Sequence, residues 1–234
     1  LTGLGGSGTH GLLTSEQVSL DLLGNATTSQ VWTDRAAKKI TQVTTTPTSA
    51  TPAVQVTVNG VTVSSQSPTG VAMTYSYDDL GRQTLALRAG SHQVAQRTGY
   101  DALGRVAWVE DAASNRTSFG YDSVGRQIAV TNAQGQVTHT AYDNEDRVIA
   151  TWGATYPVAY EFDAFGRMTA MYTYRGTNEI SALQDFNLSA FDKTQWCYDT
   201  ASGALTNKVY SDGKGPSYTY TADGKLATRT WARG

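Results

Sequence analysis

The sequence is poor in the residue types that most often carry chemistry. It contains one cysteine, Cys197, and three histidines, His10, His92 and His139, that are far apart in the chain. A single cysteine excludes an internal disulfide, and none of the histidines is spaced from cysteine or glutamate as a zinc site requires. Because Cys197 is flanked by aromatic residues, we expect a packed strand residue rather than a nucleophile. We predict no catalytic residue, no metal site and no cofactor.

Charge and long apolar runs are also scarce. Charged residues make up 16% of the chain, the formal net charge is −2, and no cluster of lysine and arginine stands out. Nucleic acid and anionic membranes are therefore poor candidates for partners. No run of about 18 apolar residues is present, so we expect no membrane span. The first residues show neither a start methionine nor a signal peptide pattern, and we expect the chain to be a piece of something longer.

Glycine and tyrosine are abundant, with 23 and 13 copies. Threonine, serine, valine and tyrosine dominate the segments between turns, which favours strands over helices. One motif, Tyr-Asp-x-x-Gly-Arg, recurs in three complete copies and two variants, at spacings of 23, 21, 21 and 20 residues. The repeat residues are Tyr77, Asp78, Gly81 and Arg82; Tyr100, Asp101, Gly104 and Arg105; Tyr121, Asp122, Gly125 and Arg126; Tyr142, Asp143 and Arg147; and Phe162, Asp163, Gly166 and Arg167. A unit recurring at this length predicts a repeat architecture.

The motif predicts a tight hairpin turn. Asp at the first turn position accepts hydrogen bonds from N–H groups ahead of it, and Gly at the fourth adopts a positive φ without a steric clash. We therefore expect a hairpin with a one-residue bulge at each copy. Positive φ is predicted for Gly81, Gly104, Gly125, Gly135 and Gly166, with Ser114 and Asp146 in the same position without glycine. A second turn series, beginning at Asp111 and Asn132, makes the chain reverse every 10 or 11 residues.

Outside the regular repeats the pattern is less uniform. Asp21–Gly24 is an outlying copy of the turn, and Asn59-Gly60 lies between alternating arms as a hairpin signal. Asn178–Trp196 falls in an insertion and is expected to form either a short helix capped by Asn178 or an irregular flap. We divide the chain into atypical repeats (1–72), regular repeats (73–167), an insertion (168–197) and further repeats truncated at the C-terminus (198–234).

Two interpretations of the repeated polar and aromatic residues remain. Arg and Tyr can form ladders across neighbouring hairpins, with Arg over aromatic rings or paired to the turn Asp. The same residue types also occur on carbohydrate-binding surfaces. Glu161 with Asp163, and Glu145 with Asp146, could imitate the carboxylate pair of a glycosidase, although a turn already accounts for most of the carboxylates.

Tyr-Asp-x-x-Gly-Arg at about 21-residue spacing resembles the YD repeats of bacterial Rhs proteins. The same repeats occur in the B/C components of insecticidal Tc toxins and in the extracellular region of teneurins. The resemblance covers about residues 15–234. It implies a long β-sheet ribbon that spirals into a hollow shell, which in toxin members encloses a C-terminal toxic domain. Those shells contain far more repeats than this chain, and the Asp-Pro-x-Gly self-cleavage motif of many toxin-type shells is absent.

The sequence thus predicts an all-β fold, a curved antiparallel meander of repeated β-hairpins that forms a YD-repeat ribbon, with room for one short helix in the insertion. The expected function is structural: a segment of a secreted or cell-surface Rhs/YD-repeat shell that encloses or displays another domain, with a toxin domain as one candidate. The alternative is a carbohydrate-binding or adhesion module, and an enzyme ranks third. Expected partners are neighbouring repeats of a longer parent chain, self-association through sheet edges, an enclosed C-terminal domain, or glycans.

Overall fold

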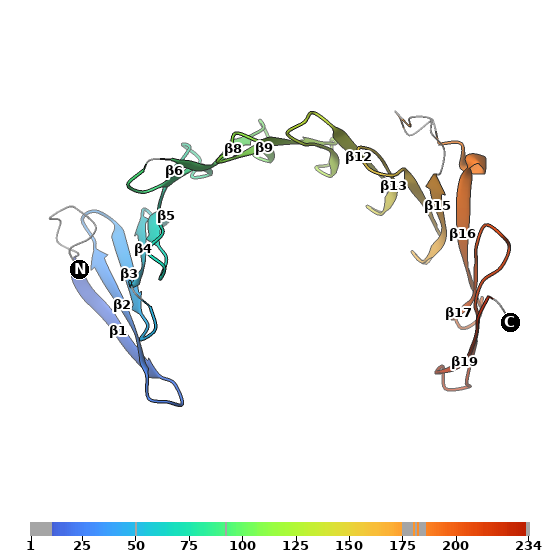
Figure 1. Cartoon of the computed structure of the whole chain (residues 1–234), viewed down its shortest axis with the longest axis horizontal. Helices are drawn as coiled ribbons and strands as arrows, with labels where there is room; N and C mark the ends of the chain where they lie inside the picture. Colours follow the sequence, from blue (N-terminus) through green and yellow to red (C-terminus); the bar gives the residue numbers. More distant parts are fainter. Residues whose placement is uncertain are drawn as a thin grey trace. The chain divides into compact units, whose positions relative to one another are not determined.

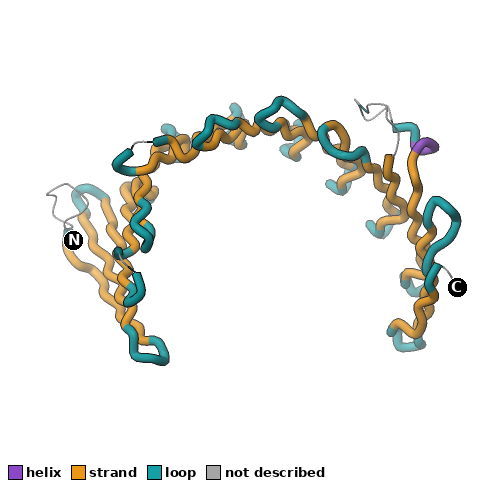
Figure 2. The backbone as a smooth tube through the Cα atoms, in the orientation of Figure 1, coloured by secondary structure: helices purple, strands orange, loops and turns teal. Residues whose placement is uncertain are grey.

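The computed structural model describes residues 11–49, 51–91, 93–174, 180, 182 and 186–232. The chain forms two compact units, Leu1–Arg116 and Thr117–Gly234. Strands and turns alternate throughout the described residues of both units (Figure 2). Those residues contain no helix long and apolar enough to cross a membrane. The predicted all-β class is confirmed, whereas the division into four repeat blocks stays a prediction.

The first unit is an antiparallel meander in which each strand pairs with its neighbours in chain order (Figure 1). Its strands are β1 (Leu12–Leu20), β2 (Ala26–Asp34), β3 (Lys39–Thr45), β4 (Ala53–Val58), β5 (Val61–Gln66), β6 (Ala72–Tyr77), β7 (Gln83–Arg88), β8 (Val94–Tyr100) and β9 (Val106–Asp111). The sheet of this unit curves between β3 and β6 (Figure 1), as the twist of successive strands allows. Few side chains of this unit are fully buried. Hydrogen bonds and contacts between repeats therefore provide much of its stability.

The second unit continues the same pattern of antiparallel pairing. Its strands are β10 (Arg116–Tyr121), β11 (Gln127–Thr131), β12 (Val137–Tyr142), β13 (Val148–Gly153), β14 (Val158–Phe162), β15 (Met168–Tyr174), β16 (Phe191–Tyr198), β17 (Leu205–Val209), β18 (Ser217–Tyr220) and β19 (Leu226–Thr230). A 3-10 helix, η2 (Leu188–Ala190), precedes β16. It falls inside the segment where we expected a helix or a flap, but Asn187 caps it. The expected cap, Asn178, lies outside the described residues.

The predicted turns are confirmed at the level of the backbone. The five glycines have φ between 76° and 97°, and Ser114 and Asp146 both have φ of 63°. In each complete hairpin the N–H of the turn Asp donates to the carbonyl of the Arg four residues on, for example Asp78 to Arg82 at 2.9 Å. The hydrogen-bonded turn sets the register of the two strands that flank it. The local sequence therefore determines where the chain reverses.

The predicted bulges are confirmed as well. The strand register shifts immediately before the aromatic residue at the end of β6, β8, β10, β12, β14, β16 and β18. In β6, for instance, Ser76 pairs with Leu85 but Tyr77 pairs with Gln83, which leaves Thr84 as the extra residue. A bulge changes which face of the sheet a side chain points to. The side chains of these strands therefore do not alternate regularly between the two faces up to the aromatic residue.

The largest hydrophobic cluster among the described residues lies in the second unit, where the insertion meets the sheet. Trp152 on β13, Tyr172 on β15 and Phe191 at the start of β16 are buried against small alanine side chains and Ile180. Phe186 contacts this cluster, with ring centres 5.8 Å from Trp152 and 5.4 Å from Phe191. The segment before β16 therefore packs on the sheet through aromatic residues.

Candidate functional site

Each repeat carries one tightly bonded turn. In the turn between β6 and β7, Oδ1 of Asp78 accepts from the N–H groups of Leu80 at 3.0 Å and Arg82 at 2.9 Å. The guanidinium Nε of Arg82 donates to Oδ2 of the same carboxylate at 2.7 Å. The same Nε–Oδ2 bond measures 2.7 Å in Asp101–Arg105, Asp122–Arg126 and Asp163–Arg167, and 2.6 Å in Asp143–Arg147. The Asp therefore organises both the turn and the orientation of the Arg.

The oriented Arg reaches the next repeat. The Cζ atom of Arg82 lies 4.5 Å from the centre of the Tyr100 ring, which belongs to the following copy of the motif. Equivalent stacks join Arg126 to Tyr142 at 5.0 Å, Arg147 to Phe162 at 4.8 Å and Arg167 to Tyr198 at 4.4 Å. A guanidinium at this distance is attracted to the face of the ring. We call this series of Asp–Arg–aromatic contacts the repeat ladder.

The tyrosine closes each step of the repeat ladder. Its hydroxyl donates to the carbonyl of the residue that directly follows the stacking Arg. Tyr100 donates to Gln83 at 2.8 Å, and Tyr142 donates to Gln127 at 3.0 Å. Tyr198 donates to Met168 at 2.9 Å. Each of these rings is thus held by one stack and one hydrogen bond, both from the preceding repeat.

The repeat ladder continues where the sequence is irregular. Between Arg167 and Tyr198 the insertion adds length to the chain, yet the stack forms and Nη1 of Arg167 donates to the carbonyl of Gly203 at 3.1 Å. Asp146 replaces the usual glycine, and its Oδ1 accepts from Nη1 of Arg126 in the preceding repeat at 3.0 Å. An added ion pair therefore accompanies the residue that is strained at positive φ.

The bonding of the turns keeps their carboxylates ionised. The pKa of Asp78 is lowered from its ordinary value of 3.8, chiefly by the N–H of Arg82, which acts against desolvation. At Asp163 desolvation is the largest single effect and raises the pKa, but the hydrogen bonds from Arg167 and Phe165 together lower it. Carboxylates that accept several hydrogen bonds are stable as anions, so these groups are poorly suited to carry a proton as a general acid.

The carboxylate pairs that could imitate a glycosidase are held by other residues. Asp163 bonds to Arg167 in its turn, and Glu161 accepts a hydrogen bond from the hydroxyl of Tyr172 at 2.8 Å. Glu145 pairs with Arg147, while Asp146 pairs with Arg126. Each of the four carboxylates therefore has its own partner within the protein.

The described residues contain no cluster of three or more histidine, cysteine, aspartate or glutamate side chains that could hold a metal. His139 stacks on Trp152 with ring centres 5.2 Å apart. Cys197 lies half-buried on β16, where it pairs with Asn207. His10 and His92 lie outside the described residues.

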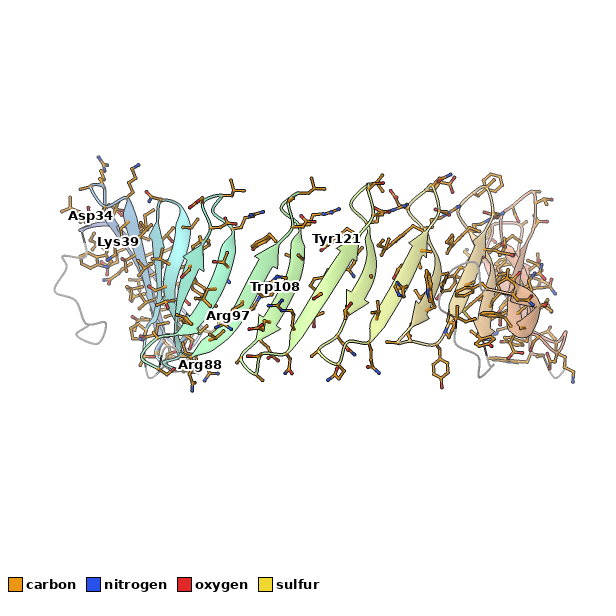
Figure 3. The ribbon with its side chains drawn as sticks, turned by 90° about the horizontal axis from the view of Figure 1, so that it is seen from above. Asp34, Lys39, Arg88, Arg97, Trp108 and Tyr121 are labelled. Carbon is orange, nitrogen blue, oxygen red and sulfur yellow. The ribbon has the colours of Figure 1, made fainter. Side chains whose placement is uncertain are left out.

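Trp108 shows how the prominent aromatic residues of the first unit are used. It pairs with Gly99 across β8 and β9, and a Cβ atom on that glycine would lie 2.2 Å from the indole. The Cζ atom of Arg116 lies 3.9 Å from the ring centre. Glu110 accepts from Arg97 at 2.7 Å and pairs with Arg116 at 3.4 Å. Figure 3 shows Arg97 and Trp108 on this part of the sheet. The ring is therefore packed against the protein's own groups.

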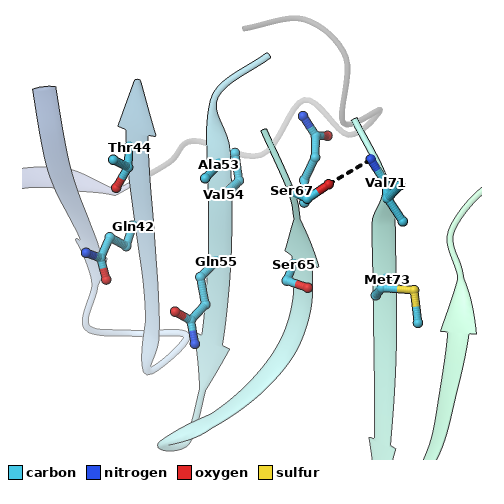
Figure 4. Close-up of a pocket in the computed structure, with 10 residues that line it drawn as sticks. Gln42, Thr44, Ala53, Val54, Gln55, Ser65, Ser67, Val71 and Met73 are labelled. Atoms are coloured by element: carbon cyan, nitrogen blue, oxygen red, sulfur yellow. Dashed lines mark hydrogen bonds between the residues drawn. The ribbon is translucent and has the colours of Figure 1, made fainter. Parts of the chain in front are cut away.

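A depression of about 420 Å³ lies over β3 to β6 in the first unit (Figure 4). Gln42, Gln55, Ser65 and Met73 are successive cross-strand partners along it. At its end Oγ of Ser67 accepts from the N–H of Val71 at 3.1 Å. Its lining is uncharged and so lacks the paired acid and base that hydrolysis requires.

Sequence reasoning anticipated the Asp–Arg pairs and the Arg–aromatic stacks, but it missed three features. These are the bond from each Tyr hydroxyl to the preceding repeat, the aromatic cluster around Phe186, and the Arg97–Glu110–Arg116 group. The regular spacing of the Tyr could have indicated the first, since each ring meets the same position of the repeat before it. The other two depend on strand register, for which the sequence has no local signal.

Comparison with known proteins gives a family match for part of the chain and a similar fold among solved structures. The model of the RHS Repeat family matches residues 100–137 and 121–157. Comparison with curated proteins gives no match. Among solved structures, the chain is similar to the Tc holotoxin pore of Photorhabdus luminescens, with 12% identity and a TM-score of 0.52 over 93% of this chain and 15% of that one.

A crystal structure of TcdB2–TccC3 is similar too, with 13% identity and a TM-score of 0.50 over 92% of this chain and 14% of that one. Likeness at this identity concerns the fold, and the chain spans about one seventh of the length of these toxin chains. The family match and the fold agree with the turn motif and with the repeat ladder. The resemblance inferred from the sequence is thus confirmed: residues 100–157 match the RHS Repeat model, and the fold is similar to that of Tc toxin chains.

Proposed function

We propose that this chain is a structural segment of a secreted or cell-surface shell that encloses or displays another domain. The observation that carries this proposal is the repeat ladder, in which the motif residues of one hairpin hold the next. Arg82, for example, bonds to its own Asp78 and stacks on Tyr100 of the following repeat. Such contacts can extend through any number of hairpins, because each repeat supplies the surface that the next requires.

The toxin structures support the proposal at the level of fold, since their chains are several times longer and contain the same kind of sheet. Enclosure of a cargo, secretion and a longer parent chain are parts of the proposal. The motif residues serve in it as structural connectors. Asp78 and its equivalents bond to turn N–H groups and to Arg, which leaves them little capacity to act on a substrate.

A carbohydrate-binding module is the alternative. The packing of the aromatic side chains in the structure favours it less than their presence in the sequence did. Sugar-binding platforms need rings whose faces are open to the ligand. Trp108 contacts Gly99 and Arg116, Trp152 stacks with His139, and Cζ of Arg229 lies 3.6 Å from the ring centre of Trp231. Guanidinium and imidazole groups thus cover a face of these rings, although Trp231 remains 64% exposed.

The test is imaging of the full-length parent protein by electron microscopy. A closed hollow particle, with density inside it or a domain displayed on it, is the expected result. A compact or filamentous particle without a cavity would contradict the shell. A glycan array run on the 234-residue chain separates the alternative, because binding of neutral glycans that is lost on removal of Trp108 would favour a carbohydrate module.

We also propose that the segment is not an enzyme. The polar residues that recur most regularly are bonded within turns, and the reactive types do not gather among the described residues. Incubation with panels of glycan, ester and peptide substrates should give no turnover. Turnover that disappears on changing Glu145, Glu161 or Cys197 would overturn the proposal.

A further inference from the structure

The turn between β2 and β3 gathers positive charge in a chain whose formal net charge is −2. Arg35, Lys38 and Lys39 line a depression of about 550 Å³, together with Asn59 and Gly60 from the neighbouring turn between β4 and β5. The two turns are therefore adjacent in space although about 20 residues separate them in sequence. Figure 3 shows Asp34 and Lys39 at this end of the hairpin.

Backbone contacts fix the position of this basic turn. Oδ1 of Asp34 accepts from the N–H of Ala37 at 3.1 Å, and the carbonyl of Lys38 accepts from the N–H of Asn59 at 3.0 Å. Lys38 has a φ of 47°, an uncommon value for a residue other than glycine. The second bond ties the two turns together, so the basic side chains project from a framework that is ordered before any ligand binds, which lowers the cost of binding.

The charge of this turn is not balanced in the way it is elsewhere. In the repeat turns the Arg bonds to the turn Asp, as Arg82 does to Asp78 at 2.7 Å. Within the part of the chain that the structure describes, Arg35, Lys38 and Lys39 form no ion pair with a carboxylate. Asp34 is the one acidic residue of the lining, so the depression has two more positive than negative charges.

These features define the chemistry of a ligand. Three cations on a fixed turn attract an anion with several oxygen acceptors, and the forked Arg35 guanidinium suits a tetrahedral oxyanion. No aromatic side chain lines the depression, whereas single-stranded nucleic acid is normally held by stacking of bases on aromatic rings. We propose that this turn binds sulfate or phosphate groups carried by a polysaccharide, a binding site that is independent of the shell function.

The experiment measures binding of the 234-residue chain to dextran sulfate and to unsulfated dextran of the same length, at about 50 and 200 mM salt. We expect binding to dextran sulfate alone, weakening with salt as counterions are released. The variant R35Q/K38Q/K39Q should lose at least about tenfold in affinity and show a shallower salt dependence by about one per charge removed. K39Q alone should give an intermediate loss, which guards against misfolding of the triple variant.

The control is R88Q/K214Q/K225Q, which removes the same charge from exposed positions elsewhere. It should retain binding, and equal loss in this variant would overturn the proposal by showing a response to net charge. Equal binding to unsulfated dextran would overturn it too. So would tighter binding of a single-stranded oligonucleotide through Arg35, Lys38 and Lys39. Competition by inorganic phosphate or sulfate at the same residues supports the oxyanion site, and a gain from the polymer over the free ion identifies the polysaccharide as the source.

Discussion

Two turn residues, Ser114 and Asp146, share an unusual backbone conformation but differ in their side-chain contacts. Ser114 and Asp146 both have φ of 63°, a conformation that glycine adopts without strain. They differ in what the side chain does, because Asp146 accepts a hydrogen bond from Arg126. No side-chain hydrogen bond of Ser114 is found among the described residues, so strain there has no evident compensation.

Replacing each with glycine should separate strain from bonding. We expect Ser114→Gly to stabilise the protein by about 0.5–1 kcal/mol, because it removes the cost of a left-handed residue with a Cβ atom. Asp146→Gly should give a smaller gain or a loss, since it also removes the ion pair with Arg126. Chemical denaturation of both variants measures the difference. A larger gain at Asp146 than at Ser114 would contradict this account.

The turn carboxylates predict a pH dependence. The pKa values of Asp78, Asp101, Asp122, Asp143 and Asp163 are all lowered in the folded chain. The folded state therefore binds fewer protons than the unfolded state, and stability falls as pH decreases. The contribution is fully present above the unfolded pKa of about 3.9 and is lost as pH falls through the lowered folded values.

Thermal melts should thus show a melting temperature that is level down to about pH 4.5 and falls below the ordinary pKa of about 3.9. Asp101→Asn retains most of the shape of its turn, but its amide does not take up a proton as the pH falls. This variant should start from a lower stability and lose less of it on acidification. A melting temperature that is unchanged between pH 6 and pH 2 would show that these turns do not stabilise the folded chain.

At the scale of the element, one step of the repeat ladder lacks the hydrogen bond that a tyrosine hydroxyl makes in the others. Phe162 stacks under Arg147 as the tyrosines stack under their arginines, but it has no hydroxyl. In the equivalent position Tyr142 donates to the carbonyl of Gln127, so a tyrosine at 162 should reach the carbonyl of Val148. We expect Phe162→Tyr to stabilise the second unit by about 1 kcal/mol, the usual net value of one hydrogen bond.

The reverse change, Tyr142→Phe, is the matched control and should destabilise by a similar amount. Both variants keep the stacked ring and differ in one hydroxyl, so the comparison isolates the hydrogen bond. Denaturation curves of the two variants and the parent chain provide the measurement. A loss of stability in Phe162→Tyr would mean that the carbonyl of Val148 is not placed as in the other repeats.

The packing of the insertion can be tested at the same scale. Phe191 is 9% exposed in the hydrophobic cluster, and truncation of a buried phenylalanine typically costs about 3–5 kcal/mol. Phe191→Ala should therefore destabilise the second unit strongly and change the fluorescence of Trp152. Tyr156, which is 84% exposed, provides the control, since Tyr156→Ala should have little effect. Equal effects of the two changes would mean that the insertion is not anchored by this cluster.

At the scale of the whole molecule, we predict that the outermost strands recruit partners. Within the described residues β1 pairs with β2 alone, and every residue of β1 is exposed. An edge strand with free backbone groups favours pairing with another chain. Sedimentation of the 234-residue chain at increasing concentration should show association. Val18→Lys should reduce it, whereas Leu80→Lys, at an exposed turn, should not. A monomer at every concentration would contradict the prediction.

The sequence was informative where structure is determined locally. Asp and Gly at the first and fourth positions define a turn through contacts within five residues, so the turn at Asp78–Arg82 could be predicted. The hydrogen bond between Asn59 and Lys38 could not be predicted, because it depends on two hairpin ends that become adjacent only in the folded sheet. The packing of Phe186 on Trp152 is of the same kind. Contacts that require strand register were thus beyond a reading of local pattern.

The two ends of the hairpins in the second unit differ in what they tolerate. Turns at the Asp–Arg end span five or six residues, whereas connections at the opposite end range from the four residues between Gly153 and Val158 to the long segment between Tyr174 and Phe191. The Arg167–Tyr198 stack survives the longest of them. The opposite end is accordingly where foreign peptides could be grafted, for example after Ala154, so that natural or engineered variety accumulates on that margin without disturbing the periodic scaffold.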